Sequence, residues 1–341
     1  MNISIQVSGD CWYNQPEVEQ LLANTPGNTD LVLDLNSEGP SLERLGITGV
    51  IDAWLAQHNQ APSTVTITRW SNSAEKIRYN TYFCSIPHSH FWYMSDSYKI
   101  DPVDCLPNNS ERLFGLFLGR GTVSRNVILY QTQQQWADKF LISRLRSYTP
   151  EGRRVPEPWN IPNQTGWKML ELLSDWLPTD QHDQIVEWFN TTEFASIDNR
   201  TVRDQFGDKL NHGIHNRSML DHYHKFSIEL VCETYTLGNT FFPTEKTVRP
   251  IMGTKPWLIH GPAGYIQNLK QLGFQSFELL WDESYDRLEG AARWHAMQKI
   301  IDTLTKLNPV SLRMLLEQAH HIALFNRQIL NAFLNHDNQN I

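Results

Sequence analysis

The chain of 341 residues is too long for one ordinary hydrophobic core and suits two domains of about 100 to 200 residues each. Apolar residues make up 40% and charged residues 19%, which excludes an intrinsically disordered chain. The net charge of −8 provides no broad basic surface, so nucleic acid is not indicated as a partner.

The cysteines and the N-terminus indicate the compartment. The 4 cysteines are scattered, without the paired spacing of a zinc site or the density of a disulfide-rich scaffold. The first residues have no basic flank followed by an apolar core, and no run of about 18 apolar residues occurs. We therefore expect reduced thiols, no membrane span and a cytoplasmic protein.

In the first hundred residues, short strand patterns alternate with helical patterns. Runs rich in β-branched residues and leucine predict strands at 3–7, 30–35 and 63–70. Apolar residues at helical spacing predict helices at 17–24 and 49–59. Strands that alternate with helices indicate βαβ units around a parallel sheet.

A segment rich in Pro, Asn, Asp and Ser at 101–112, DPVDCLPNNSER, is typical of a connector between domains. We therefore expect one α/β domain over 1–105 and a second over 112–300, the second opening with a strand, a glycine turn and a helix. Within it, 149–219 predicts helices and no sheet. Residues 301–341 are predicted to form C-terminal helices.

The later part of the second domain continues the alternation. KFSIELVCETY at 225–235 and PWLIH at 256–260 predict strands. TEKTVRPIM at 244–252 and GYIQNLKQL at 264–272 predict helices. The second of these helices is followed by Gly273, at the position that favours left-handed backbone geometry.

The stretch TEKTVRP concentrates charge beside an apolar run. Thr244 can cap a helix that begins at Glu245, because its hydroxyl satisfies a main-chain N–H of the first turn. A helix N-terminus favours anions, and Lys246 and Arg249 lie on one face of this helix. These two cations can bind the phosphates of a diphosphate, and the carboxylate of Glu245 can accept hydrogen bonds from a pair of ribose hydroxyls. An exposed ion pair between Glu245 and Arg249, worth about 0.3 to 0.5 kcal/mol, explains the same spacing without a ligand.

These segments resemble the donor-binding half of two-domain glycosyltransferases with the GT-B fold, and most of all the fucosyltransferase pattern. Glu233 falls where that family has a glutamate at the end of a strand, and Glu245 and Lys246 fall on its Glu-Lys pair. LFLGRGTVSR is similar to the first strand and turn of a donor domain. That similarity implies a phosphate-binding role for Arg120 or Arg125.

The resemblance implies two Rossmann-like domains that face a cleft, with the C-terminal helices packing back on the first domain. It implies a nucleoside diphosphate sugar as the donor and a glycan or another hydroxyl compound as the acceptor. Cations and helix N-termini would stabilise the diphosphate, so we expect no metal and no cofactor. The TEKT-RP segment, with 273–277 and 282–286, also resembles uncharacterised viral glycosyltransferase-like proteins, for which the compartment would be the host cytoplasm.

Such a transferase needs a base that removes a proton from the acceptor hydroxyl, and histidine or a carboxylate can serve. In the predicted first domain, IPHSHFWYMSD places His88, His90 and Asp96 after a strand-like run, and Asp10 follows the first strand. These residues are the base candidates. The alternative for the two histidines is packing among aromatic side chains.

A second group of histidines occurs in NHGIHNRSMLDHYHK. It contains side chains of the kinds that bind zinc, namely His212, His215, Asp221, His222 and His224. Their spacing differs from the HxxxH pattern that places two histidines on one helix face, so polar loop histidines are the simpler interpretation. Two alternative functions remain: a metal-dependent hydrolase built on this group, and a non-catalytic nucleotide- or sugar-binding or interaction protein on a transferase scaffold.

Overall fold

The computed structural model divides the chain into two units, which are described separately. It describes residues 1–4, 7–8, 12–13, 15–35, 42–43, 46–70, 79–84, 110–118, 122–144, 173–192, 222–238 and 241–337. The first unit comprises 1–87, 234–242 and 261–265, and the second comprises 88–233, 243–260 and 266–341. Of the predicted connector, residues 101–109 lie outside the described part.

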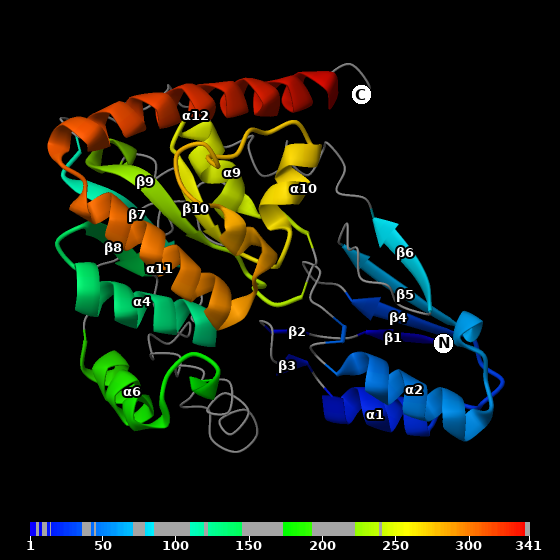
Figure 1. Cartoon of the computed structure of the whole chain (residues 1–341). Coiled ribbons are helices and arrows are strands. Elements are labelled where there is room, and N and C mark those ends of the chain that lie inside the picture. Colours follow the sequence, from blue (N-terminus) through cyan, green and yellow to red (C-terminus); the bar gives the residue numbers. More distant parts are fainter. Residues whose placement is uncertain are drawn as a thin grey trace, which may run out of the picture. The chain divides into compact units, whose positions relative to one another are not determined.

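The first unit is built on a parallel sheet of 4 strands in the order β1-β4-β5-β6 (Figure 1). These strands are β1 (Asn2–Ser4), β4 (Leu31–Leu35), β5 (Val65–Trp70) and β6 (Asn80–Cys84). The connecting elements are α1 (Gln15–Ala23), α2 (Ile47–His58) and the short η1 (Pro62–Thr64), and β2 (Val7–Ser8) pairs antiparallel with β3 (Trp12–Tyr13). The spatial order follows the chain order, so the βαβ pattern predicted for this region is confirmed.

The core of the first unit lies between the helices and the sheet. Val18 and Leu22 of α1 are one turn apart and belong to the same buried apolar cluster as Ile51 and Leu55 of α2 and Leu33 of β4. Residues three to four apart share one face of a helix, while alternate residues share one face of a strand. The helix period of three to four residues and the strand period of two therefore place these apolar side chains in one core.

The second unit is built on another parallel sheet of 4 strands, in the order β10-β9-β7-β8. The strands are β7 (Arg112–Leu118), β8 (Phe140–Arg144), β9 (Phe226–Cys232) and β10 (Trp257–His260). The chain starts in the middle of the sheet with β7, adds β8 on one side, and then adds β9 and β10 on the other. The direction of winding therefore reverses between β7 and β9.

Helices flank both faces of this second sheet. The longer ones are α4 (Val123–Trp136), α6 (His182–Thr191), α9 (Glu245–Met252), α10 (Tyr265–Gln271), α11 (Gly290–Lys306) and α12 (Pro309–Asp337), and the short 3-10 turns are η4 (Thr179–Gln181), η6 (Tyr223–Lys225) and η7 (Ser284–Arg287). Helix α11 contacts α4 and β10, whereas α9 contacts β9 and α12. Figure 1 shows α4 and α11 on one side of the sheet and α9 and α12 on the other.

Several local predictions for the second unit are confirmed. The strands β9 and β10 and the helices α9 and α10 lie within the predicted segments. Gly273 has a φ of +95, the left-handed geometry expected after α10, and the ring of Phe274 packs against Phe333 of α12. Strand β8 was not predicted. Both final helices contact elements of the second unit, and their predicted packing on the first domain stays a prediction.

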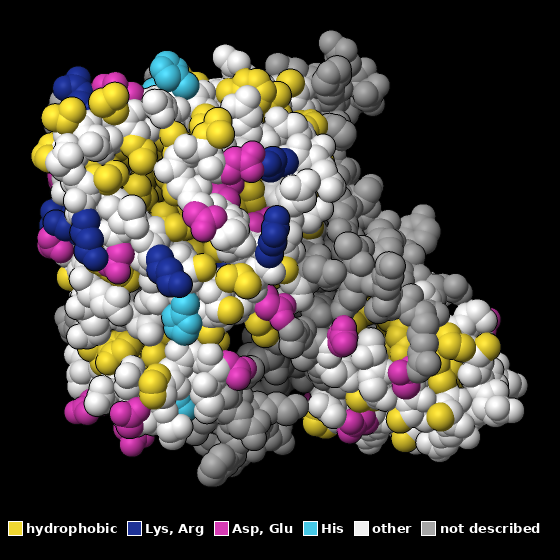
Figure 2. All heavy atoms as spheres, viewed as in Figure 1, with side chains coloured by type: hydrophobic (Ala, Val, Ile, Leu, Met, Phe, Trp, Pro, Cys, Tyr) yellow, Lys and Arg dark blue, Asp and Glu magenta, His cyan; other side chains and the backbone are white. Residues whose placement is uncertain are grey.

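Two further features concern possible partners: the distribution of charge on the surface, and the length and apolar character of the helices. On the visible face of the second unit, acidic and basic side chains are interspersed (Figure 2). Among the helices of the described residues, none has the combined length and apolar character that a membrane span requires.

Candidate functional site at the end of strand β9

The carboxyl ends of β7 and β9 lie side by side where the strand order of the second sheet reverses. In open parallel sheets, ligands bind at this position, because the connections on either side leave in opposite directions and open a crevice. Helix α4 begins after β7, and Glu233 directly follows β9. This edge therefore holds Arg125 and Glu233, which the sequence predicted for donor binding. Glu233 also contacts the start of α9, where three more predicted residues lie: Thr244, Glu245 and Lys246.

The carboxylate of Glu233 joins the end of β9 to the start of α9. Its side chain is buried and accepts hydrogen bonds from the main-chain N–H of Thr244 at 3.3 Å and the Thr244 hydroxyl at 2.7 Å. It also accepts a bond from the Thr247 hydroxyl at 2.6 Å. The main-chain N–H of Glu233 donates to the carbonyl of His260 at 2.9 Å, so its backbone is fixed as well.

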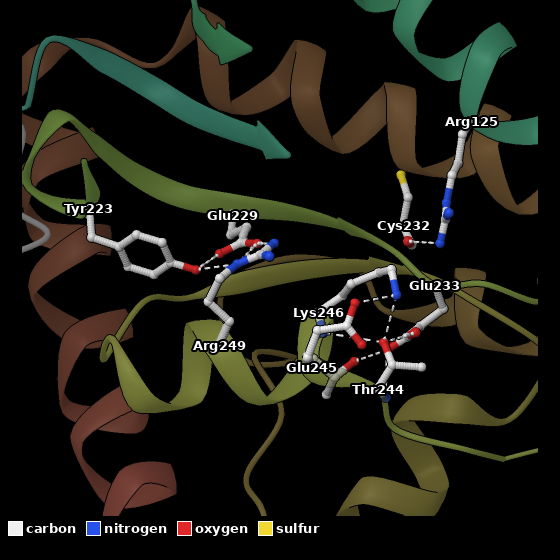
Figure 3. A network of polar contacts seen from close by, with 10 residues as sticks. Arg125, Tyr223, Glu229, Cys232, Glu233, Thr244, Glu245, Lys246 and Arg249 are labelled. Carbon is white, nitrogen blue, oxygen red and sulfur yellow. Dashed lines mark hydrogen bonds and ion pairs between the residues drawn. The ribbon is translucent and has the colours of Figure 1, made fainter. Parts of the chain in front are cut away.

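The predicted cap of α9 is confirmed. Thr244 has an extended backbone, and its hydroxyl oxygen accepts a hydrogen bond from the main-chain N–H of Lys246 at 3.2 Å. The same oxygen accepts a bond from the Lys246 ammonium at 3.1 Å. One hydroxyl therefore connects the strand-end carboxylate, the first turn of the helix and the lysine side chain (Figure 3).

Lys246 and Glu245 form an ion pair at this helix start, with 2.7 Å between the ammonium and the carboxylate. Both remain partly accessible, with side-chain exposures of 12% and 26%. Burial alone would raise the pKa of Glu245, but the positive charges of Lys246 and Arg249 outweigh burial and hold this pKa at about 2. The carboxylate is therefore ionised at neutral pH and can accept hydrogen bonds from hydroxyl groups.

Arg249 takes a different place from the one predicted. Its guanidinium group is 3% exposed and forms an ion pair with the buried Glu229 of β9. Its Nε also donates to the Tyr223 hydroxyl oxygen at 2.9 Å, and the Tyr223 hydroxyl donates to Glu229. The Phe117 ring lies 5.3 Å from the guanidinium carbon. Figure 3 shows this group apart from the cluster around Thr244, so the structure does not bring Arg249 together with Lys246.

Burial sets the protonation of the Tyr223, Glu229 and Arg249 group. Burial raises the pKa of Glu229, while the neighbouring Arg249 charge lowers it. Burial also raises the pKa of Tyr223 well above its usual value, and the Glu229 charge adds to this effect. A neutral phenol and a closely paired arginine therefore fix α9 against β9.

Arg125 lies in the first turn of α4 and contacts the end of β9. Thr122 caps this helix by accepting a bond from the main-chain N–H of Arg125 at 3.3 Å. The buried guanidinium group donates to the main-chain carbonyl of Cys232 at 3.1 Å. Burial raises the pKa of the Cys232 thiol to about 12, so this thiol is neutral and a poor nucleophile. Arg120 lies outside the described residues.

Arg144 is a residue of this edge that the sequence analysis missed. It ends β8, its side chain is 2% exposed, and it donates to the side-chain oxygen of Asn126 at 3.2 Å. Its guanidinium carbon lies 4.6 Å from the centre of the Phe189 ring. The signal was the apolar run FLISR that ends in an arginine, but it becomes visible only once that run is recognised as a strand.

The stretch at 282–286 has a structural role within the second unit. The Asp286 carboxylate accepts bonds from the main-chain N–H groups of Ile266 at 2.9 Å and Gln267 at 3.0 Å, at the start of α10. It also pairs with the buried Arg293 of α11 at 2.9 Å. Arg293 in turn donates to the Ile259 carbonyl of β10 at 2.9 Å. These contacts join α10, α11 and β10.

The remaining candidates fall mostly outside the described residues, which do not include His88, His90, Asp96, Asp10, His212, His215 and Asp221. His222 and His224 are described and lie at η6, directly before β9 and thus at the opposite end of this strand from Glu233. Within the described part of the chain, no group of three or more His, Cys, Asp or Glu side chains could hold a metal ion.

No protein-family model, no curated protein and no solved structure matches this chain. The fold is α/β with parallel sheets. A functional assignment therefore depends on the geometry and charge of the site at the end of β9.

Proposed function

We propose that the chain is a metal-independent glycosyltransferase of the GT-B type, which moves a sugar from a nucleoside diphosphate sugar to an acceptor hydroxyl. The observation that supports this most is the hydrogen-bonded group of Glu233, Thr244 and Lys246 at the switch point of the second sheet. Together with Glu245, which pairs with Lys246, this group combines a capped helix start, a cation and two carboxylates at the sheet edge where ligands bind.

The charges of this group suit the parts of such a donor. Lys246 and Arg125 would bind the diphosphate, and the sequence resemblance adds Arg120 to them. The ionised Glu245 would accept hydrogen bonds from neighbouring hydroxyls of the ribose or the sugar, because a carboxylate has two oxygens for such a pair. Glu233 would hold the end of β9 and the start of α9 in fixed positions relative to each other, as its three hydrogen bonds indicate.

The proposed reaction breaks the bond between the anomeric carbon and the diphosphate oxygen. Negative charge develops on the leaving diphosphate, and fixed cations stabilise that charge without a metal. The acceptor oxygen forms the new glycosidic bond and gives its proton to a base, for which His88, His90, Asp96 and Asp10 are the candidates. In this proposal the first domain binds the acceptor across a cleft and the protein acts in the cytoplasm, that of the host if the chain is viral.

For Arg249 we propose a supporting role in place of direct phosphate binding. Its ion pair with Glu229 lies inside the second unit, between β9 and α9. A cation that is already paired in a buried place cannot move to a ligand without leaving Glu229 as a buried, unpaired charge. Arg249 would therefore hold the helix on which Lys246 is presented.

A thermal-shift panel of UDP, GDP, ADP, CMP and dTDP tests the donor site. A ligand at about 100 times its Kd stabilises a folded protein by about 2.7 kcal/mol, so the matching nucleotide should raise Tm by several degrees. Lys246→Ala should remove most of this shift. Lys270→Ala is the matched control, because Lys270 also pairs with a glutamate, Glu278, at 2.9 Å but lies on α10.

Three results would contradict the proposal. The first is that no nucleotide raises Tm. The second is that Lys246→Ala leaves the Tm shift unchanged. The third is that stoichiometric zinc or manganese accompanies the purified protein and supports hydrolysis. Nucleotide binding without any turnover of a sugar donor would instead favour a non-catalytic nucleotide-binding protein.

A further inference from the structure

Two buried arginines lie at the carboxyl edge of the second sheet, on the side of α4. Arg144 is the last residue of β8 and pairs in register with Leu118, the last residue of β7. Arg125 belongs to the first turn of α4, which follows β7, and reaches the carbonyl of Cys232 at the end of β9. Their side chains are 2% and 3% exposed. The carboxyl ends of three adjacent strands therefore carry two guanidinium groups.

Positive charge gathers on the α4 side of this edge, whereas the Glu233 carboxylate at the end of β9 is bound by Thr244 and Thr247. Arg144 and Arg125 are connected through α4, because Arg144 donates to Asn126, the neighbour of Arg125 in the chain. The N-terminus of α4, a helix of 14 residues capped by Thr122, adds the positive end of its dipole. Buried cations are costly to desolvate, so an anion that enters this edge would gain strongly from them.

We infer that Arg144 and Arg125 together bind a diphosphate group at the carboxyl end of β7. This inference rests on the proposed function and makes Arg144 a further donor-binding residue. An arginine presents its N–H groups in a planar fork that matches two oxygens of a phosphate, which a lysine cannot do. Two such forks suit the two phosphates of a diphosphate better than a monophosphate.

Isothermal titration calorimetry tests this inference with inorganic diphosphate, with the nucleoside diphosphate that raises Tm most, and with the corresponding nucleoside. Arg144→Gln should weaken binding of both phosphorylated ligands about tenfold or more, the effect of one charge-assisted hydrogen bond. Binding of the nucleoside should be unchanged. Arg112→Gln is the matched control, because Arg112 lies at the other end of β7 and is exposed.

Arg144→Lys covers the case in which the glutamine variant does not fold. It keeps the charge and loses the fork, so affinity for the diphosphate should fall about threefold or more while circular dichroism and Tm stay close to the wild type. Equal affinity of the wild type and the folded Arg144 variant for diphosphate overturns the inference, and so does an equal loss for nucleoside and nucleotide.

The failure of this inference differs from the failure of the proposed function. If a nucleoside diphosphate binds and Lys246→Ala weakens it while Arg144 variants do not, only the role of Arg144 is lost. If wild-type protein binds neither inorganic diphosphate nor any nucleoside diphosphate, both are lost. If inorganic diphosphate binds in an Arg144-dependent manner but no sugar donor is consumed, the anion site stands without the transferase.

Discussion

The hydroxyl of Thr244 lies 2.7 Å from the carboxylate of Glu233, and this contact joins the end of strand β9 to the first turn of α9. The two residues are 11 positions apart in the sequence. The carboxylate is fixed by donors on both Thr244 and Thr247, so the helix start is set in place before any ligand arrives. A binding site with such support needs little rearrangement to bind its ligand.

Thr244→Val should destabilise the protein. The change removes the hydroxyl that donates to Glu233 and accepts from Lys246, so a loss of about 1 to 2 kcal/mol is expected. Urea unfolding followed by circular dichroism measures it. Thr303→Val is the control, because Thr303 is at an exposed position of α11 and, among the described contacts, its hydroxyl donates only to the Lys299 carbonyl. Its loss should change stability by less than about 0.5 kcal/mol. Equal effects of the two variants would contradict this account of the cap.

The ion pair of Arg249 and Glu229 should be strongly coupled. Removal of either partner, in Arg249→Met or Glu229→Gln, leaves the other buried group without its counter-charge and should cost about 3 to 5 kcal/mol. The double variant should cost less than the sum of the two, with a coupling energy above about 1 kcal/mol. A double-mutant cycle from urea unfolding measures this difference.

The control for that cycle is the exposed pair of Arg313 and Glu317 on α12, whose Nε and carboxylate lie 3.1 Å apart. Exposed pairs of this kind contribute about 0.3 to 0.5 kcal/mol. Additive effects at Arg249 and Glu229, within the error seen for the exposed pair, would show that the buried pair does not hold α9.

Acid should destabilise the protein partly through His260. Burial lowers the pKa of His260 from 6.5 to about 3, and the positive charge of Arg293 adds to the effect. The unfolded chain therefore binds a proton that the folded chain excludes between these pH values. The contribution of His260 to stability is present above about pH 6.5 and is lost as the pH falls, at up to about 1.4 kcal/mol per pH unit.

His260→Gln isolates this contribution, because a glutamine can still donate to the Gly290 carbonyl that His260 contacts at 3.1 Å. Between pH 6 and 4.5, the stability of this variant from urea unfolding should fall less steeply than that of the wild type. His295→Gln, at an exposed position of α11, should follow the wild type. Parallel slopes for all three proteins would show that His260 is not held neutral.

Local patterns predicted the elements that build the site. Thr244 before Glu245 predicted the capped start of α9, and the structure has that cap because a threonine hydroxyl and a main-chain N–H two residues on are neighbours in any helix start. The apolar runs at β9 and β10 predicted two buried strands, because parallel strands that are covered on both faces consist mostly of apolar residues. Gly273 predicted the left-handed end of α10, since only glycine adopts that backbone readily.

Contacts between distant residues were not predictable in this way. Spacing along the helix favoured Glu245 as the partner of Arg249, but Arg249 pairs with Glu229, 20 positions earlier, because α9 packs on β9. The place of Arg144 depends on β8 lying beside β7, which no local signal fixed. Tertiary packing decided both, and the order of strands had to be known first.

The most direct test of the proposed transferase is the release of the free nucleotide from nucleotide-sugar donors. Purified protein is incubated with UDP-, GDP-, ADP-, CMP- and dTDP-linked sugars, a mixture of glycans as acceptors and a chelator, and the free nucleotide is measured by chromatography. The wild type should consume one donor, Lys246→Ala should be at least about tenfold slower, and Lys270→Ala should match the wild type. No consumption above the protein-free rate, or equal rates for Lys246→Ala and the wild type, would contradict the central claim.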